Sequence, residues 1–396
     1  MAVMSFDVAR VRGLYPTLGT TSVHLDGPLA TLQPESVVRA IIATLRASPA
    51  QPGSRSARSK RTERSAAQAR AAVGDLVGAR PDDVVLGTSE GSLLTRLATL
   101  TARSWTLGDE IVLSRMDSDL VRLPWLRAAR GAGAVVRWAE VDLETGELPT
   151  WQYERLINDH TKIVTVPLAN PATGTVPQVR AIADLAHAHE AIVVVDAGAA
   201  LPYLPVDITE LGADVLTLSA ATFGGPTVAA MAARPGLLLS LDAGKLHRPE
   251  FGPLPIELLD GLTAAVDHLA GLTEQEFGTR RERLIASITE AGEYSRYLYE
   301  YLDERLRHIP DVTVLGSSAD RLPLVAFTVA GRTPEQVGDY LERSGISAWT
   351  GPSGMSELLS AFGADELGGA TFIGLMPHST VAEIEQLLNA VEALVY

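Results

Sequence analysis

The residues with the clearest chemical potential lie just after predicted strands. The strand expected at 83–86 runs into Gly87, Thr88, Ser89 and Glu90, where a helix is expected to begin. Backbone amides at a helix N-terminus, joined by small hydroxyl side chains, form a cup that binds phosphate. An ordinary helix cap needs only one serine or threonine. The segment therefore predicts a phosphate cup, with a plain helix cap as the alternative.

A second candidate is Asp196, which ends the strand predicted at 192–196. Ligands of α/β sheets bind at the carboxyl ends of parallel strands, so a carboxylate at this position can face a ligand. It can equally well cap the next helix, and the residue alone does not decide between the two. Asp117 and Asp119 also follow a predicted strand. For them, surface capping is the favoured interpretation over acid or base chemistry.

Metal and thiol chemistry find no support in the sequence. The eight histidines show no metal-ligand spacing backed by nearby carboxylates, so no metal site is predicted. The chain contains no cysteine, which excludes a thiol nucleophile, a disulfide and a thiolate metal site within it.

The elements that must position these residues alternate regularly between about 34 and 250. The expected strands are 83–86, 110–113, 134–138, 162–166, 192–196 and 215–218. The expected helices are 34–46, 62–77, 91–103, 119–131, 149–157 and 178–189. Strand and helix in alternation predict a mainly parallel sheet that is covered by helices on both faces.

A different pattern begins after Pro253 and predicts a smaller α+β unit. Its expected helices are 256–270, 276–308, 334–343 and 381–394, and its expected strands are 322–328 and 371–375. We therefore divide the chain into an N-terminal arm at 1–20, a large domain at 21–260 and a small C-terminal domain at 261–396.

Length, composition and charge set the broad class. The 396 residues are 46% hydrophobic and 20% charged, which is a globular composition with room for two domains. The net charge of −15 argues against nucleic acid as a partner. No apolar run reaches the ~20 residues that cross a bilayer, and no signal-peptide core opens the chain. We expect no membrane association and a cytoplasmic location. One local cluster is basic, and a solvated loop and helix start is favoured for it over an anion site: Arg55, Arg58, Lys60, Arg61, Arg64 and Arg70.

The segment 213–226 carries a specific resemblance. In the class V aminotransferase and cysteine desulfurase family, a strand that begins Ala-Asp ends in Ser-x-His-Lys or Ser-x-Tyr-Lys, and a Gly-Pro step follows. The chain resembles this family because the same frame is present: Ala213-Asp214, Ser219, Phe223 and Gly225-Pro226. In the family, the lysine forms the internal aldimine with pyridoxal phosphate. Here Ala221 replaces the histidine or tyrosine, and Thr222 replaces the lysine.

The resemblance implies the fold of fold-type-I pyridoxal-phosphate-dependent transferases. That fold is α/β, with a large domain built on a mainly parallel, seven-stranded sheet flanked by helices and a smaller C-terminal α+β domain. It also implies a homodimer with sites at the dimer interface. The positions that match cofactor-binding residues of the family are Thr88, Ser89, Glu90, Ser118, Asn170, Asp196 and Ser219. Among these, Asp196 would meet the pyridine nitrogen, and Ser118 replaces a ring-stacking histidine. Phe372 replaces an arginine for the substrate carboxylate.

The missing lysine limits the chemistry that the resemblance implies. A threonine has no amine for an imine bond, and its hydroxyl is a poor base at neutral pH, so Thr222 is expected to be inactive. The chain contains three lysines, Lys60, Lys162 and Lys245. A substitute lysine is not favoured, and Lys60 is the least implausible of the three. Relatives that mobilise sulfur use a cysteine of the smaller domain, which this chain lacks.

Three functions remain open from the sequence. The first is a catalytically altered member, or pseudoenzyme, that holds pyridoxal phosphate or another small phosphorylated ligand noncovalently. The second is an active pyridoxal-phosphate-dependent aminotransferase or lyase with a nonstandard base. The third is a structural or regulatory dimeric protein with no cofactor. Fold alone does not choose among them.

Overall fold

A computed structural model describes most of the chain. The residues it describes are 6–19, 22–27, 29, 31–241, 254–275, 277–317, 320–352 and 354–395. Within them, no helix is both long and apolar enough to cross a membrane.

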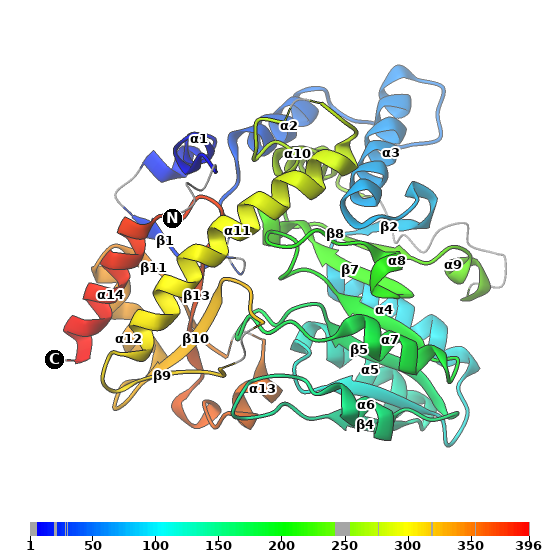
Figure 1. Cartoon of the computed structure of the whole chain (residues 1–396). Coiled ribbons are helices and arrows are strands. Elements are labelled where there is room, and N and C mark those ends of the chain that lie inside the picture. The colour runs from blue at the N-terminus through cyan, green and yellow to red at the C-terminus, as the bar shows by residue number, and fades with distance from the viewer. Residues whose placement is uncertain are drawn as a thin grey trace.

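A seven-stranded sheet forms the centre of the larger part of the molecule (Figure 1). In spatial order, its strands are β2 (Val84–Gly87), β8 (Ala229–Ala233), β7 (Val215–Ser219), β6 (Ile192–Asp196), β5 (Thr161–Pro167), β3 (Glu110–Ser114) and β4 (Val135–Ala139). All pairs are parallel except those that β8 makes with β2 and β7. The prediction of a mainly parallel, seven-stranded sheet is confirmed. The six strands predicted for this sheet are present, and no end is shifted by more than one residue.

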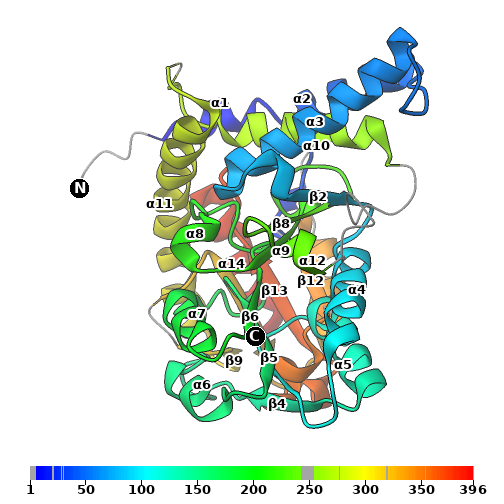
Figure 2. The same ribbon diagram turned by 90° about the vertical axis from the view of Figure 1, so that its right-hand side faces the viewer.

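Helices cover both faces of the sheet, as Figure 2 shows. On one face lie α4 (Glu90–Thr101) and α5 (Asp119–Ala132), and on the other lie α6 (Thr150–Leu156), α7 (Val179–His187) and α8 (Ile208–Leu211). Each strand contributes side chains to the cores on both faces, because successive side chains point to opposite sides of the sheet. Along β3, Ile111 and Leu113 pack with α4 and α5, whereas Val112 belongs to the larger core on the opposite face.

Three helices form a further layer beside β2 and β8 (Figure 1). These are α2 (Glu35–Arg46), α3 (Ala57–Val77) and α10 (Ile256–Leu269). The helix α10 packs against α2 and α3, so it joins the larger part of the molecule, and the boundary predicted at 260 falls inside it. A short helix, α9 (Leu237–Leu241), follows β8.

The C-terminal part is a smaller α+β unit built on a four-stranded antiparallel sheet. Its strand order is β12 (Trp349–Gly351), β13 (Ala370–Gly374), β10 (Leu324–Val329) and β9 (Val312–Val314). The helices that accompany it are α11 (Arg280–Arg307), α12 (Pro334–Arg343), α13 (Ser356–Ala361) and α14 (Val381–Val395). Short 3-10 turns are Pro16–Gly19, Pro81–Asp83, Ala102–Ser104, Ala220–Phe223 and Asp365–Leu367.

The N-terminal segment attaches to this smaller unit. The strand β1 (Val23–His24) pairs in parallel with β11 (Ile346–Ser347). In α1 (Val8–Arg12), the guanidinium of Arg12 donates to the carboxylate of Glu383 at 2.9 Å and to the carbonyl of His378 at 2.7 Å. An ion pair and a strand pairing therefore hold the beginning of the chain against α14 and β11.

Candidate functional site

Three acidic side chains gather at the carboxyl edge of the seven-stranded sheet. Asp196 ends β6, Asp117 follows β3, and Glu90 begins α4 just after β2. The charge of Asp196 acts on both of the other carboxyl groups, which places all three near one another. Parallel α/β sheets bind ligands at this edge.

Asp196 is the most open of the three. Its Oδ1 accepts a hydrogen bond from the amide of Gly198 at 2.9 Å, and part of its surface remains exposed to solvent. Burial by the surrounding protein raises its pKa to about 6. A side chain at Gly198 would lie 3.2 Å from Asp196 Oδ1 and 3.6 Å from Thr222 Cγ2. The structure therefore brings the side chains of Asp196 and Thr222 close to the same glycine.

Glu90 is buried, with 8% of its surface exposed. Its Oε1 accepts a hydrogen bond from Thr217 Oγ1 at 2.5 Å. Burial and the nearby charge of Asp196 raise the pKa of Glu90 to about 8. At neutral pH its carboxyl group is therefore mostly protonated.

Asp117 is 1% exposed, so the prediction that it caps a helix at the surface is wrong. Its Oδ2 accepts hydrogen bonds from the amide of Ser114 at 2.9 Å and from the hydroxyl of Thr165. Its Oδ1 is buried without a partner among the described residues. Burial raises its pKa to about 7, and the charge of Asp196 contributes to that rise.

The predicted phosphate cup lies at the N-terminus of α4. Ser89 caps this helix by accepting a hydrogen bond from the amide of Ser92 at 3.3 Å, so a helix cap is present. Thr88 is exposed and lines a groove of ≈ 710 Å³ between α4 and α5. Three arginines, Arg96, Arg103 and Arg127, line the same groove. The helix end is thus open to an anion, with cationic side chains along its approach.

The side chains of Ser118 and Asn170 form hydrogen bonds with the backbone around them. Ser118 caps α5 by accepting a hydrogen bond from the amide of Val121 at 3.4 Å. Asn170 is fully buried and donates to the carbonyl of Met116 at 3.0 Å. Its Oδ1 accepts from the amide of Ala172 at 2.8 Å and from that of Thr173. The amide of Asn170 therefore fixes a loop and has little capacity left for a ligand.

Thr222 lies in the 3-10 turn that joins β7 to β8. Its Oγ1 donates to the carbonyl of Ser219 at 2.9 Å. The turn ends at Gly224, whose φ of 83° is a conformation that favours glycine. The hydroxyl of Thr31 accepts from the amide of Gly224 at 2.9 Å and donates to the carbonyl of Ala221 at 2.5 Å. Hydrogen bonds thus fix the backbone at the position where the family has its lysine. The side chain at that position is the short hydroxyl of Thr222.

The lysines lie elsewhere. Lys60 is exposed near the start of α3. Lys162 stands at the opposite, amino-terminal edge of the sheet, with Nζ 3.4 Å from Asp109 Oδ1. Lys245 lies outside the described residues.

Sequence reasoning missed a group of charged contacts between the small unit and α5. Glu357, in α13, accepts from Arg115 and lies 3.3 Å from Arg122. Arg122 also donates to Ser356 Oγ at 2.7 Å, and the amide of Asp119 donates to the carbonyl of Gly354 at 2.7 Å. These contacts, which we name the α5 latch, hold the small unit against the helix that Ser118 caps.

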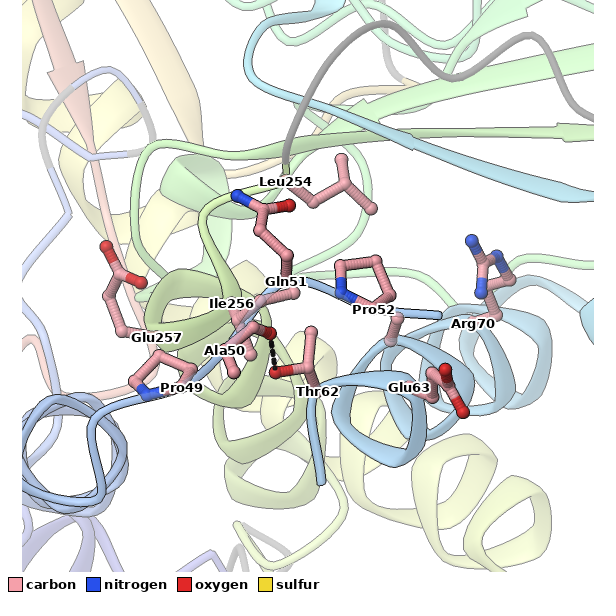
Figure 3. A pocket seen from close by; sticks show the side chains of 11 residues that line it. Pro49, Ala50, Gln51, Pro52, Thr62, Glu63, Arg70, Leu254, Ile256 and Glu257 are labelled. Carbon is pink, nitrogen blue, oxygen red and sulfur yellow. Dashed lines mark hydrogen bonds between the residues drawn. The ribbon is translucent and has the colours of Figure 1, made fainter. Parts of the chain in front are cut away.

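A separate groove of ≈ 670 Å³ lies between the loop at 49–52, α3 and the start of α10 (Figure 3). Glu63 and Arg70 line it, and none of the residues matched to the cofactor does. Arg70 is the one member of the basic cluster among the lining residues. The first five members of the cluster are exposed, which confirms the solvated interpretation for them, but Arg70 is only 9% exposed. Among the residues that the structure describes, no group of three histidine, cysteine or acidic side chains is arranged to hold a metal ion.

The family profile of class-V aminotransferases matches residues 23–242 and 283–387. The chain belongs to this family. It is 40% identical to an uncharacterized protein of Mycobacterium tuberculosis over 399 residues, covering 99% of this chain and 100% of that protein. It is 26% identical to a cysteine desulfurase of Klebsiella pneumoniae over 426 residues, covering 99% of both.

Solved structures confirm the fold of this class-V aminotransferase family member. The apo cysteine desulfurase of Thermococcus onnurineus superposes with a TM-score of 0.87 at 23% identity, covering 100% of this chain and 99% of the other. A variant of the protein C-DES superposes with a TM-score of 0.78 at 20% identity, covering 96% and 98%. In that variant one lysine is replaced by alanine, and glycine is covalently linked to the pyridoxal-phosphate cofactor. The predicted fold type, with its relation to pyridoxal-phosphate proteins, is thus confirmed.

Proposed function

We propose that this protein is a catalytically altered class-V aminotransferase-like protein that binds pyridoxal phosphate, or its amine form pyridoxamine phosphate, without a covalent bond. One observation carries the proposal. The carboxyl edge keeps the partly open carboxylate of Asp196, while Thr222, at the position of the lysine, has no amine. The site therefore retains a partner for a cationic ring but has lost the covalent anchor.

The side chains at this edge fit the cofactor in two respects. Asp196 Oδ1 receives one amide, and no described residue forms an ion pair with this carboxylate, so it can accept a hydrogen bond from a protonated ring nitrogen. The N-terminus of α4, with Thr88 and Ser89, suits a phosphate group. When bound, the cofactor supplies an electron sink for carbonyl chemistry.

The residues at the same edge do not suit catalysis with the cofactor. Ser118, Ala199 and Ala221 are small, so no aromatic ring at these positions stacks on the cofactor. Phe372, 3% exposed on β13, offers no charge to a substrate carboxylate. Without cysteine, sulfur transfer through a persulfide on this chain is excluded. These replacements favour binding over turnover.

The C-DES variant supports the feasibility of such a site. It retains its cofactor with glycine attached although one lysine has been removed. A protein of this fold thus still holds its cofactor after one of its lysines has been replaced by alanine. We apply this here as an analogy, because an identity of 20% relates the two chains through their fold.

Absorbance spectroscopy and thermal unfolding test the proposal. With added pyridoxal phosphate, the wild-type protein should be stabilised without gaining a band that borohydride abolishes. Thr222→Lys restores an amine next to Gly198 and should gain such a band. Asp196→Asn in the same background is the matched control, and its band should be weaker. A borohydride-sensitive band in the wild type would instead support an active enzyme, and no stabilisation by either cofactor form would support a protein without cofactor.

We further propose a homodimer, as the family resemblance implies. Sedimentation equilibrium should give twice the chain mass of 42.0 kDa. A monomer at micromolar concentration would contradict this.

A further inference from the structure

The resemblance matches Glu90 to a cofactor-binding position, but its buried carboxyl group bonds to Thr217 and makes no direct contact in the binding proposed above. Glu90 is the first residue of α4, a position where an exposed carboxylate would stabilise the helix dipole. Its side chain is instead buried and accepts a hydrogen bond from Thr217 on β7. Thr217 is the register partner of Asp196 on β6. Glu90 is thereby fixed to the strand that lies directly beside Asp196.

In the described part of the chain, the charged groups that act on this cluster are acidic or already paired. Asp117, which follows β3, also lies at this edge and is itself affected by Asp196. Arg122 on α5 acts on Asp117, but its guanidinium is bonded to Asp119 and Glu357. Among the described residues, no lysine or arginine forms an ion pair with Glu90 or Asp196. Two ionised carboxylates cannot share such a space without a large cost.

We propose that Glu90 is a positioning residue that retains a proton beside Asp196, so that the pair carries one negative charge and Asp196 presents it to the ligand. The relative acidities agree with this arrangement, because burial raises the pKa of Glu90 to about 8 and that of Asp196 to about 6. In the part that concerns the ligand, the inference rests on the proposed function. It makes the site selective for a ring with a cationic nitrogen, since a single localised charge faces it.

The arrangement fixes the sign of a pH dependence. A glutamate titrates near pH 4.3 in an unfolded chain, whereas Glu90 titrates near pH 8 in the folded protein. A raised carboxyl pKa means that the folded state binds the proton more tightly than the unfolded state. The stabilisation from this proton is complete below about pH 4.3 and is lost as the pH rises to about 8.

Thermal unfolding of Glu90→Gln between about pH 4 and pH 9 tests the inference without any ligand. Glutamine mimics the protonated carboxyl group and keeps an acceptor for Thr217. The variant should approach the wild type near pH 4, become progressively more stable than the wild type as the pH rises to about 8, and keep that difference up to about pH 9. The matched control is Glu110→Gln, because Glu110 is also 8% exposed but bonds to Arg137. This control should be less stable than the wild type throughout. If the Glu90→Gln profile runs parallel to that of the wild type, or follows the control, the inference is overturned.

Calorimetric titration with pyridoxamine phosphate separates this inference from the proposed function. At pH 7, Glu90→Gln should bind within about threefold of the wild type, because Glu90 is already neutral. A loss of more than about tenfold would overturn the positioning role. If neither protein binds pyridoxamine phosphate while the unfolding profiles diverge as expected, the proposed function is wrong, but the conclusion that Glu90 is protonated is supported.

Discussion

The two edges of the seven-stranded sheet differ in the partners that they provide for buried carboxyl groups. At the amino-terminal edge, Glu110 is bonded by Arg137 at 2.7 Å and by Asn158 at 2.9 Å. Hydrogen bonds from Arg137 lower the pKa of Glu110 below its usual value. Burial opposes the same effect on Asp109, but the amide of Thr106 and the charge of Lys162 lower its pKa overall. Both acids thus have a cation and a hydrogen-bond donor as partners.

The carboxyl-terminal edge lacks this compensation. Glu90, Asp117 and Asp196 form no ion pair with a lysine or arginine in the described part of the chain, and burial raises the pKa of each. Clusters of carboxyl groups with raised pKa values are typical of functional sites rather than of structural ion pairs. The ion pairs of the amino-terminal edge therefore stabilise the fold, whereas the three acids of the carboxyl-terminal edge have no cationic partner among the described residues, as the proposed site for a cationic ring requires.

Removing Asp117 should have the largest effect on stability. Asp117→Ala leaves the amide of Ser114 and the hydroxyl of Thr165 without their acceptor inside a closed core, which should cost about 2–4 kcal/mol of unfolding free energy. Denaturant unfolding at pH 7 measures the loss. Asp117→Asn keeps both acceptor contacts and should lose less than about 1 kcal/mol. Equal losses for the two variants would show that the uncharged state is not accommodated at this edge.

At the other edge, Glu110→Ala should cost about 1–3 kcal/mol at pH 7, because Arg137 and Asn158 lose a shared acceptor. A lowered carboxyl pKa gives stabilisation that is present above about pH 4.3 and is lost as the pH falls. The gap between the variant and the wild type should therefore narrow in acid, which unfolding curves at several pH values would reveal. A gap that widens in acid would remove the contrast between the edges.

The smallest effect should come from the α5 latch. Glu357→Gln removes a partly exposed partner of Arg115 and Arg122, and exposed ion pairs of this kind contribute about 0–1 kcal/mol. Loss of the latch should increase cleavage near α13 in limited proteolysis, and added salt should produce the same change in the wild type. Unchanged cleavage in both cases would mean that the contacts do not hold the small unit in place.

Much of the fold could be predicted from the sequence because its strands are short runs of β-branched residues between amphipathic helices. The strand β8 was missed, since its sequence, Ala-Ala-Met-Ala-Ala, has no β-branched residue and no alternation. Burial between β2 and β7 makes it a strand, and that information comes from tertiary packing.

The candidate site could be predicted only in part. The positions of Asp196, Thr88 and Ser89 were predicted correctly, because Asp196 ends a strand and the other two precede a helix. The association of Glu90 with Asp196 joins residues far apart in the chain, and the direction of a buried side chain cannot be read from periodicity. Asp117 was expected to be a surface cap although it follows a predicted strand, because the local sequence does not show that its side chain bonds to Thr165 on β5. Whether the residues matched to the cofactor bind it stays a prediction.

The most direct test of the account is the affinity for pyridoxamine phosphate, measured by calorimetry at pH 7 for the wild type and for Asp196→Asn. The account predicts that the wild type binds and that the variant binds about 10- to 100-fold more weakly, because a charge-assisted hydrogen bond to the ring is lost. Equal affinities would contradict the claim that the uncompensated carboxyl edge receives a cationic ring.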